Sequence, residues 1–198
     1  MNREPVTWTS ATVSHVGNVR RLNEDSCLDH GSIGLWVVAD GMGGHHAGDL
    51  ASQLIVNTLA ALGPQSSLAA FVDAVEDGIL AANDRLVRMG AETRQTSGST
   101  VVALLAHGRH GAVLWAGDSR LYRYRDGRLE QLSRDHSQIE LYVERGLLTR
   151  EEAIGHPAAN MVTRAVGASA DLRLDADVFE LLPGDRYLLC SDGLDKHV

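Results

Sequence analysis

The chain reads Leu35-Trp36-Val37-Val38-Ala39-Asp40-Gly41-Met42-Gly43-Gly44, an apolar run that ends at a carboxylate. This pattern predicts a buried strand that places an acid at the rim of a sheet. The glycines that follow allow backbone angles that other residues avoid, and they leave the carbonyl of Gly41 open to a close ligand. An ordinary strand-to-helix turn also favours Asp-Gly, so a functional site here needs support from the rest of the chain.

Composition restricts the possible classes of protein. At 198 residues, 44% hydrophobic and 22% charged, the chain fits a single domain, residues 1–198, with a sizeable core. A net charge of −8 and a single lysine argue against a nucleic-acid partner. Cys27 and Cys190 are far apart and are expected to be reduced thiols. No membrane span or signal-peptide core is visible, so we expect a cytoplasmic protein.

Hydrophobic periodicity predicts two long helices early in the chain. Apolar residues recur every three or four positions over residues 47–62 and again from Leu68 to near Gly90. Ser66 or Ser67 can cap the second helix. Ahead of them, a loose alternation over residues 6–16 suggests a first strand, and residues 26–30 suggest a short one.

Strands dominate the second half. They are expected over residues 100–106, 112–117, 120–125, 128–132, 172–182 and 186–190. Asp126-Gly127 predicts a tight hairpin between two of them, and hairpins imply antiparallel pairing. Residues 137–146 and 149–154 are predicted to be short helices in a surface excursion. Together these patterns indicate an α+β layered fold.

Acids recur at the ends of predicted strands. Asp118 and Asp192 each follow an apolar strand beside a glycine, as Asp40 does. If those strands share one rim, the acids converge into an oxygen-only site suited to Mg²⁺ or Mn²⁺. Two such ions about 3.5–4 Å apart can activate a water for in-line phosphoryl transfer, and an arginine can clamp the phosphate.

Seven segments in order carry a family resemblance. From about Thr12 to its end, the chain resembles the PP2C-type, metal-dependent protein serine/threonine phosphatases, most closely their bacterial branch. The segments are Val19-Arg20-Arg21-Leu22-Asn23-Glu24-Asp25, Val38-Ala39-Asp40-Gly41-Met42-Gly43-Gly44-His45, Ser97-Gly98-Ser99-Thr100, Trp115-Ala116-Gly117-Asp118-Ser119-Arg120, Asp135-His136-Ser137, Thr163-Arg164-Ala165-Val166-Gly167 and Cys190-Ser191-Asp192-Gly193-Leu194.

The resemblance implies a four-layer αββα sandwich of two antiparallel sheets between helices, with residues 137–157 as a flap. It also implies two Mn²⁺ or Mg²⁺ ions and a third, weaker one. Asp40 would bridge two ions, the Gly41 carbonyl would bind one of them, and Asp192 would hold the other. Glu24 and Asp25 would serve the metal site directly or through bound water. Asp118 would bind the third ion, and Arg20 would bind the phosphate.

The chain departs from the family in two places. Met42 stands where animal relatives commonly carry a histidine regarded as a general acid, so metal-bound water or a nearby histidine would take that role. His45 and His46 are candidates by proximity, although a helix-start histidine bonded to backbone or solvent is the plainer interpretation. The family also continues with a helix and a strand whose Asp shares the ion of Asp192, whereas this sequence stops at Val198. The chain is then either a trimmed piece of a longer protein, which we expect, or a naturally incomplete member. In this chain we expect the ion held by Asp40 and Gly41 to be retained better than the ion shared with Asp192.

The expected activity is hydrolysis of phosphoserine and phosphothreonine on proteins, opposite a Ser/Thr kinase, by a monomer with no nucleic-acid or membrane partner. The alternative is a pseudophosphatase that binds phosphoproteins without turnover because one ligand carboxylate is absent. Arg120 and Arg164 are interpreted as structural, with Arg120 in a supporting ion pair.

Overall fold

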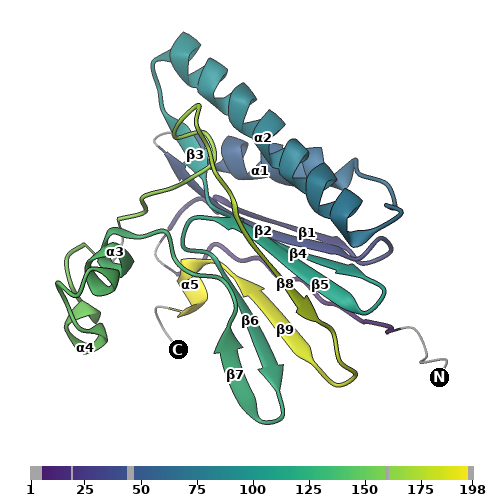
Figure 1. Ribbon diagram of the computed structural model, residues 1–198. Coiled ribbons are helices and arrows are strands. Elements are labelled where there is room, and N and C mark those ends of the chain that lie inside the picture. The colour runs from purple at the N-terminus through teal and green to yellow at the C-terminus, as the bar shows by residue number, and fades with distance from the viewer. Residues whose placement is uncertain (1–5, 19, 44–46, 159–160, 196–198) are drawn as a thin grey trace.

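The computed structural model describes residues 6–18, 20–43, 47–158 and 161–195, and it contains two antiparallel sheets packed face to face (Figure 1). The larger sheet has the order β1-β2-β4-β5-β8, with β3 paired to the end of β2; the smaller has the order β7-β6-β9. The strands are β1 (Asp25–His30), β2 (Leu35–Gly43), β3 (Ser97–Ser99), β4 (Val101–His107), β5 (His110–Ala116), β6 (Arg120–Arg125), β7 (Arg128–Gln131), β8 (Asp175–Glu180) and β9 (Arg186–Cys190). The predicted α+β fold is confirmed.

Two long helices, α1 (Ala47–Ala60) and α2 (Leu68–Thr93), cover the larger sheet. The apolar stripe of each helix is buried against that sheet, as the periodicity predicted. Ser67 caps α2, because its side chain accepts a hydrogen bond from the N–H of Ala70 at 3.1 Å. The helix continues past Gly90, the predicted end, to Thr93.

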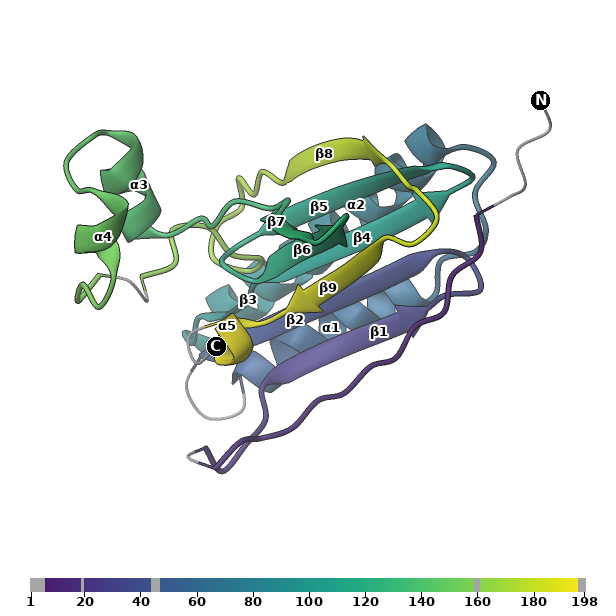
Figure 2. The same ribbon diagram turned by 90° about the horizontal axis from the view of Figure 1, so that it is seen from below.

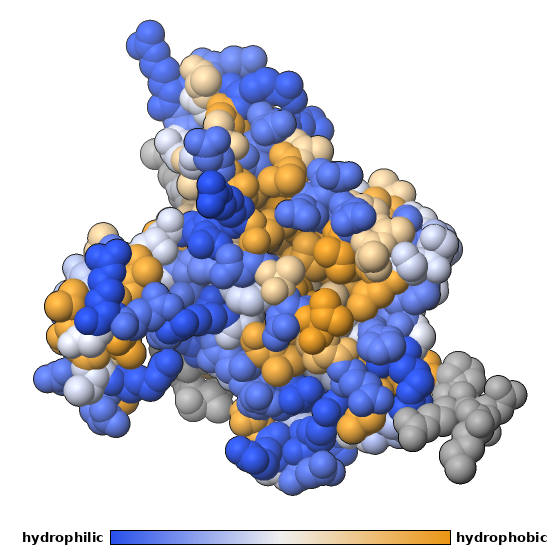
Figure 3. Space-filling model, in the orientation of Figure 1, coloured by the Kyte–Doolittle hydropathy of each residue, from blue (hydrophilic) through white to orange (hydrophobic). Residues whose placement is uncertain are grey.

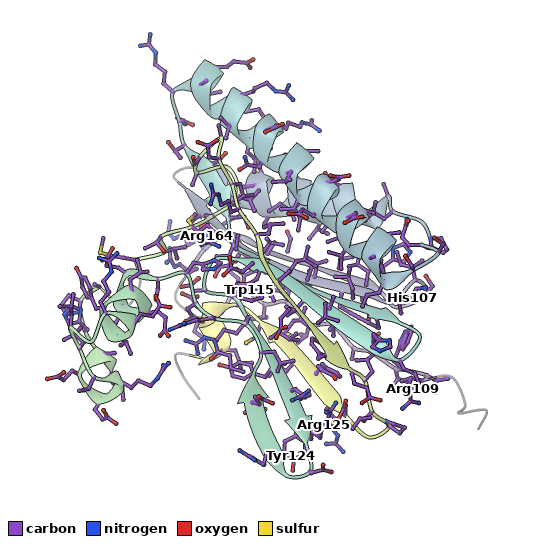
Figure 4. The ribbon with its side chains drawn as sticks, viewed as in Figure 1. His107, Arg109, Trp115, Tyr124, Arg125 and Arg164 are labelled. Atoms are coloured by element: carbon purple, nitrogen blue, oxygen red, sulfur yellow. The ribbon has the colours of Figure 1, made fainter. Side chains whose placement is uncertain are left out.

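Strand β2 lies at the centre of the packing. Leu35, Val37 and Ala39 face the helices, whereas Trp36 and Val38 face the smaller sheet. Trp115, labelled in Figure 4, belongs to the same cluster as Trp36 and Val38. Both faces of β2 are therefore covered, which explains why its sequence is apolar without alternation. The strand is longer than predicted, because residues 41–43 pair with β3.

The prediction of a first strand over residues 6–16 is wrong. This segment runs alongside β1 (Figure 2) without strand pairing and is held mainly by side chains. Trp8 Nε1 donates to the carbonyl of Gly31 at 2.8 Å, and Ser10 Oγ donates to Asp29 at 2.8 Å. Alternating residues alone do not make a strand, since a strand also needs a partner whose backbone groups pair with its own.

Three layers of the expected four are present in the described residues. No long helix in this part of the chain lies on the outer face of the smaller sheet (Figures 1 and 2). On that sheet, Tyr124 is 43% exposed and Leu188 is 46% exposed. Hydrophobic surface also extends across the middle of the face seen in Figure 3, where β8 is an edge strand and Val178 is exposed.

After the β6–β7 hairpin, the chain forms an arm that stands away from the two sheets (Figures 1 and 2). It contains α3 (Gln138–Glu144) and α4 (Arg150–Ala153), and neither helix has a buried residue. The arm joins the body where Ser137 pairs with Val162. The two predicted short helices are thus confirmed. No helix within the described residues is long and apolar enough to cross a membrane.

Candidate metal centre

Four acids meet at one end of the two sheets. Asp40 lies near the end of β2, and Asp25, the first residue of β1, is its direct partner in the antiparallel register. Asp118 follows β5, and Asp192 begins the short helix α5 (Asp192–Asp195) after β9. Both Asp118 and Asp192 interact electrostatically with Asp40. The convergence expected from the strand-end acids is therefore present.

The carboxyl group of Asp40 shows the consequence of this crowding. Burial raises its pKa, and the negative charges of Asp25, Asp192 and Asp118 raise it further, to about 8. A hydrogen bond between the carboxyl groups of Asp25 and Asp40 adds to the effect.

The donor set fits a hard divalent cation. As their side chains stand, no group of three or more His, Cys, Asp or Glu in the described residues is already arranged as a metal cluster. Asp25, Asp118 and Asp192 are nevertheless close enough to raise the pKa of Asp40, and a cation among the four acids would offset that repulsion. Oxygen-only ligands favour Mg²⁺ or Mn²⁺ over softer metals.

Asp25 also links the two sheets. Ser191, between β9 and Asp192, donates its hydroxyl to Asp25 Oδ2 at 2.8 Å. This hydrogen bond ties the end of the smaller sheet to the first residue of the larger one. It holds Asp192 and Asp25 at the same rim.

Gly41 and Glu24 lie against the first turn of α1. A β-carbon on Gly41 would lie 2.2 Å from the carbonyl oxygen of Gly48, so the strand and the helix touch through backbone alone. A β-carbon on Gly48 would lie 2.5 Å from Glu24 Oε1. Gly41 is therefore required here for close approach, not for a positive φ angle.

A cleft of about 1400 Å³ opens beside the acids. Its walls include Asp25, Asp40 and Asp192, and Arg20 lies in the same lining. Arg20 is exposed, so its guanidinium is accessible from the cleft. Glu24 and Gly41 also belong to this lining, whereas Asp118 does not.

Buried hydroxyl groups hold the backbone of Asp40, and sequence reasoning did not find them. The Asp40 carbonyl accepts from Thr100 N at 2.8 Å, and Asp40 N donates to Thr100 Oγ1 at 3.1 Å. The Ser99 hydroxyl lies 2.8 Å from the Thr100 carbonyl and 3.0 Å from the Asp40 carbonyl. Thr100 Oγ1 also lies 2.6 Å from Ser119 Oγ, next to Asp118. The one sequence signal was the Ser97-Gly98-Ser99-Thr100 segment, whose role the pattern does not reveal.

His136 holds the turn that carries Asp118. The ring atom Nδ1 of His136 accepts from the backbone N–H of Gly117 at 3.1 Å. The backbone N–H of His136 donates to the Gly117 carbonyl at 2.9 Å. Its ring stacks on Trp115. Burial lowers the pKa of His136, so the ring stays neutral and can accept that bond.

The other residues singled out from the sequence have structural contacts. Arg120 makes an ion pair with Asp135, with its nearest contact at 2.7 Å, and Arg164 bonds to Asp175. Both cysteines are free thiols. Met42 lies in β2 opposite Gly98. His45 and His46 lie outside the described residues.

Comparison with known proteins agrees with this geometry. A sequence model of the family described as protein phosphatase 2C matches residues 14–198. The chain therefore belongs to the protein phosphatase 2C family. It is 37% identical to the serine/threonine protein phosphatase PstP of Mycobacterium tuberculosis. The match covers 100% of this chain and 38% of the length of PstP. It is 31% identical to the serine/threonine phosphatase stp of Listeria monocytogenes, with 92% of this chain and 76% of that protein covered.

Solved structures share the fold. One, described as PppA, a key regulatory component of T6SS in Pseudomonas aeruginosa, is 48% identical with a TM-score of 0.90, covering 98% of this chain and 81% of that one. The catalytic domain of PstP in complex with two manganese ions is 35% identical with a TM-score of 0.81, covering 94% and 78%. These similarities identify a bacterial PP2C-type fold that holds divalent metal in a relative.

Proposed function

We propose that this chain provides the catalytic site of a metal-dependent protein serine/threonine phosphatase, which hydrolyses phosphoserine and phosphothreonine on proteins. The observation that carries the proposal is the set of four interacting acids, of which Asp25, Asp40 and Asp192 line one cleft together with Arg20. A phosphate monoester needs both positive charge for its oxygens and an activated water, and an acid cluster loaded with divalent ions meets both needs.

The proposed metal ligands are Glu24, Asp25, Asp40, Gly41, Asp118 and Asp192. Asp40 would bridge two Mn²⁺ or Mg²⁺ ions, the Gly41 carbonyl would hold one, and Asp192 would hold the other. Glu24 and Asp25 would serve the pair directly or through water, and Asp118 would hold a third, weaker ion. When bound, the ions polarise the phosphoryl group and acidify the attacking water.

The chain's own residues bind and orient the substrate. Arg20 pairs with two phosphate oxygens through its planar guanidinium group and so aligns phosphorus with the acids. Thr100 fixes the Asp40 backbone from both its N–H and its carbonyl side. Such fixed geometry lowers the cost of reaching the in-line arrangement.

The wider setting is also a proposal. Residues 1–198 form one phosphatase domain, with residues 137–157 as a flap over the substrate groove. The substrate is a phosphoprotein of a bacterial Ser/Thr kinase pathway, encountered in the cytoplasm by a monomer. The similarity to PppA supports a pathway of T6SS regulation.

The test is hydrolysis of p-nitrophenyl phosphate and of a phosphothreonine peptide, with and without Mn²⁺. We expect turnover only with the metal. Asp40→Asn should lower kcat more than about 100-fold, since loss of a bridging ligand exceeds the 10- to 100-fold typical of outer-shell partners. The matched control is Asp77→Asn on the exposed face of α2, which should keep wild-type turnover. Full activity in Asp40→Asn would contradict the assignment.

A further inference from the structure

Ser52 is a fully buried polar residue of α1 that lies outside the proposed ligand set. It is 0% exposed, and its hydroxyl donates to the carbonyl oxygen of Glu24 at 2.6 Å. The carbonyl of Asp49, one turn back in the helix, lies at 3.1 Å, and Ser26 Oγ lies at 3.0 Å. A hydroxyl has a single proton, so the shorter contact to Glu24 takes it and Ser26 can donate to the Ser52 oxygen.

The carbonyl of Glu24 joins this helix to β2. Besides Ser52, it accepts the N–H of Gly41 at 3.1 Å. One oxygen atom therefore receives hydrogen bonds from α1 and from β2. The two residues whose backbones it fixes, Glu24 and Gly41, are both proposed ligands.

No side chain separates α1 from β2 at this point. Gly41 and Gly48 touch through backbone atoms, and the carboxylate of Glu24 lies directly against Gly48. Interlocking side chains, which normally set the distance between a helix and a sheet, are absent at these two glycines. At this point the hydrogen bond from Ser52 to the Glu24 carbonyl is a directed polar contact of α1, in addition to the apolar packing of Ala51 further along the helix.

We infer that Ser52 is a positioning residue of the metal centre, acting through the Glu24 carbonyl on the Glu24 carboxylate and the Gly41 backbone. The inference rests on the proposed function. Ser52→Ala removes the hydrogen bond and adds no bulk. The Glu24 carbonyl then keeps only the Gly41 N–H, and the two ligand groups lose their fixed spacing. Divalent metal should bind more weakly while the fold persists.

The experiment is titration of metal-free protein with Mn²⁺, in which electron paramagnetic resonance reports the free ion. We expect Ser52→Ala to raise the Kd about tenfold, as for outer-shell partners of other metal sites. The matched control is Thr58→Val on the same helix, because the Thr58 hydroxyl bonds within α1 to Leu54 and does not reach the site. Its Kd should stay within about twofold of wild type, since distant sites act independently.

Circular dichroism of each metal-free variant, at the titration temperature, confirms that the Kd refers to folded protein. If Ser52→Ala does not fold, Ser52→Cys replaces it, since a thiol fills the space but is a weak donor, and the same rise in Kd is expected. A folded variant that binds Mn²⁺ as tightly as wild type would overturn the inference. Failure of the wild-type chain to bind Mn²⁺ would overturn the proposed function instead.

Discussion

Single residues at the rim show what a sequence can and cannot predict about a site. The acids Asp40, Asp118 and Asp192 were predictable, because each follows an apolar strand next to a glycine. The roles of Thr100 and Ser52, which bond to the backbone of Asp40 and of Glu24, were not predictable. A hydroxyl becomes informative only when its partner is known, and these partners lie 60 and 28 residues away.

Asp185 offers a residue-scale prediction away from the rim. Burial alone would raise its pKa, but hydrogen bonds from Arg125, the Leu182 N–H and Tyr187 outweigh burial and lower the pKa to about 2. Arg125 lies on β6 toward the end of the smaller sheet near the β6–β7 turn (Figure 4). Because the folded pKa is below the unfolded value of 3.8, the carboxylate stabilises the fold above about pH 4. That contribution is lost as pH falls toward 2.

We therefore expect Asp185→Asn to lower the free energy of unfolding by about 2 kcal/mol at pH 7. The variant should also lose less stability than wild type between pH 4 and pH 2. Urea unfolding at several pH values measures both effects. Glu144→Gln is the control, since the Glu144–Arg134 pair is exposed and should contribute less than about 1 kcal/mol. Equal losses in the two variants would contradict this view of Asp185.

At the scale of elements, the helices and hairpins were predicted well, because their signals are local. Asp126 and Gly127 both adopt positive φ, as their tight turn requires. The prediction of a strand over residues 6–16 was wrong for the opposite reason, because whether a segment forms a strand depends on a partner strand elsewhere in the chain. The pairing of β2 with β3 was also not predicted from the sequence, because the glycine-rich residues 41–43 are more typical of a turn than of a strand.

The contact between α1 and β2 gives an element-scale prediction. Gly48→Ala would place a β-carbon 2.5 Å from Glu24 Oε1 and 2.8 Å from the carbonyl carbon of Gly41. Backbone must then move, so we expect a loss of about 1–3 kcal/mol in unfolding free energy and weaker Mn²⁺ binding. Gly63→Ala is the control, because nothing lies within 4 Å of that position and its φ is not positive. Thermal unfolding of both variants measures the loss. A Gly48→Ala protein as stable as Gly63→Ala would rule out the tight contact between α1 and β2.

At the scale of the whole molecule, sequence patterns predicted an α+β layered fold but not the order of the strands. β8 pairs with β5 although the arm separates them in the chain, and β9 joins β6 rather than its neighbour in sequence. These long-range pairings bring Asp192 to the rim that Asp25 and Asp40 already occupy. The family resemblance supplied the expectation of two sheets, and the structure supplies the contacts that bring the acids together.

The most direct test of the central claim is calorimetric titration of the metal-free chain with Mn²⁺. The claim is that Asp40 and the three acids around it form a divalent metal centre, so the wild-type chain should show saturable binding. Asp40→Asn should abolish that heat, while Asp77→Asn should leave it unchanged. Absence of binding by the wild-type chain, or undiminished binding by Asp40→Asn, would contradict the account.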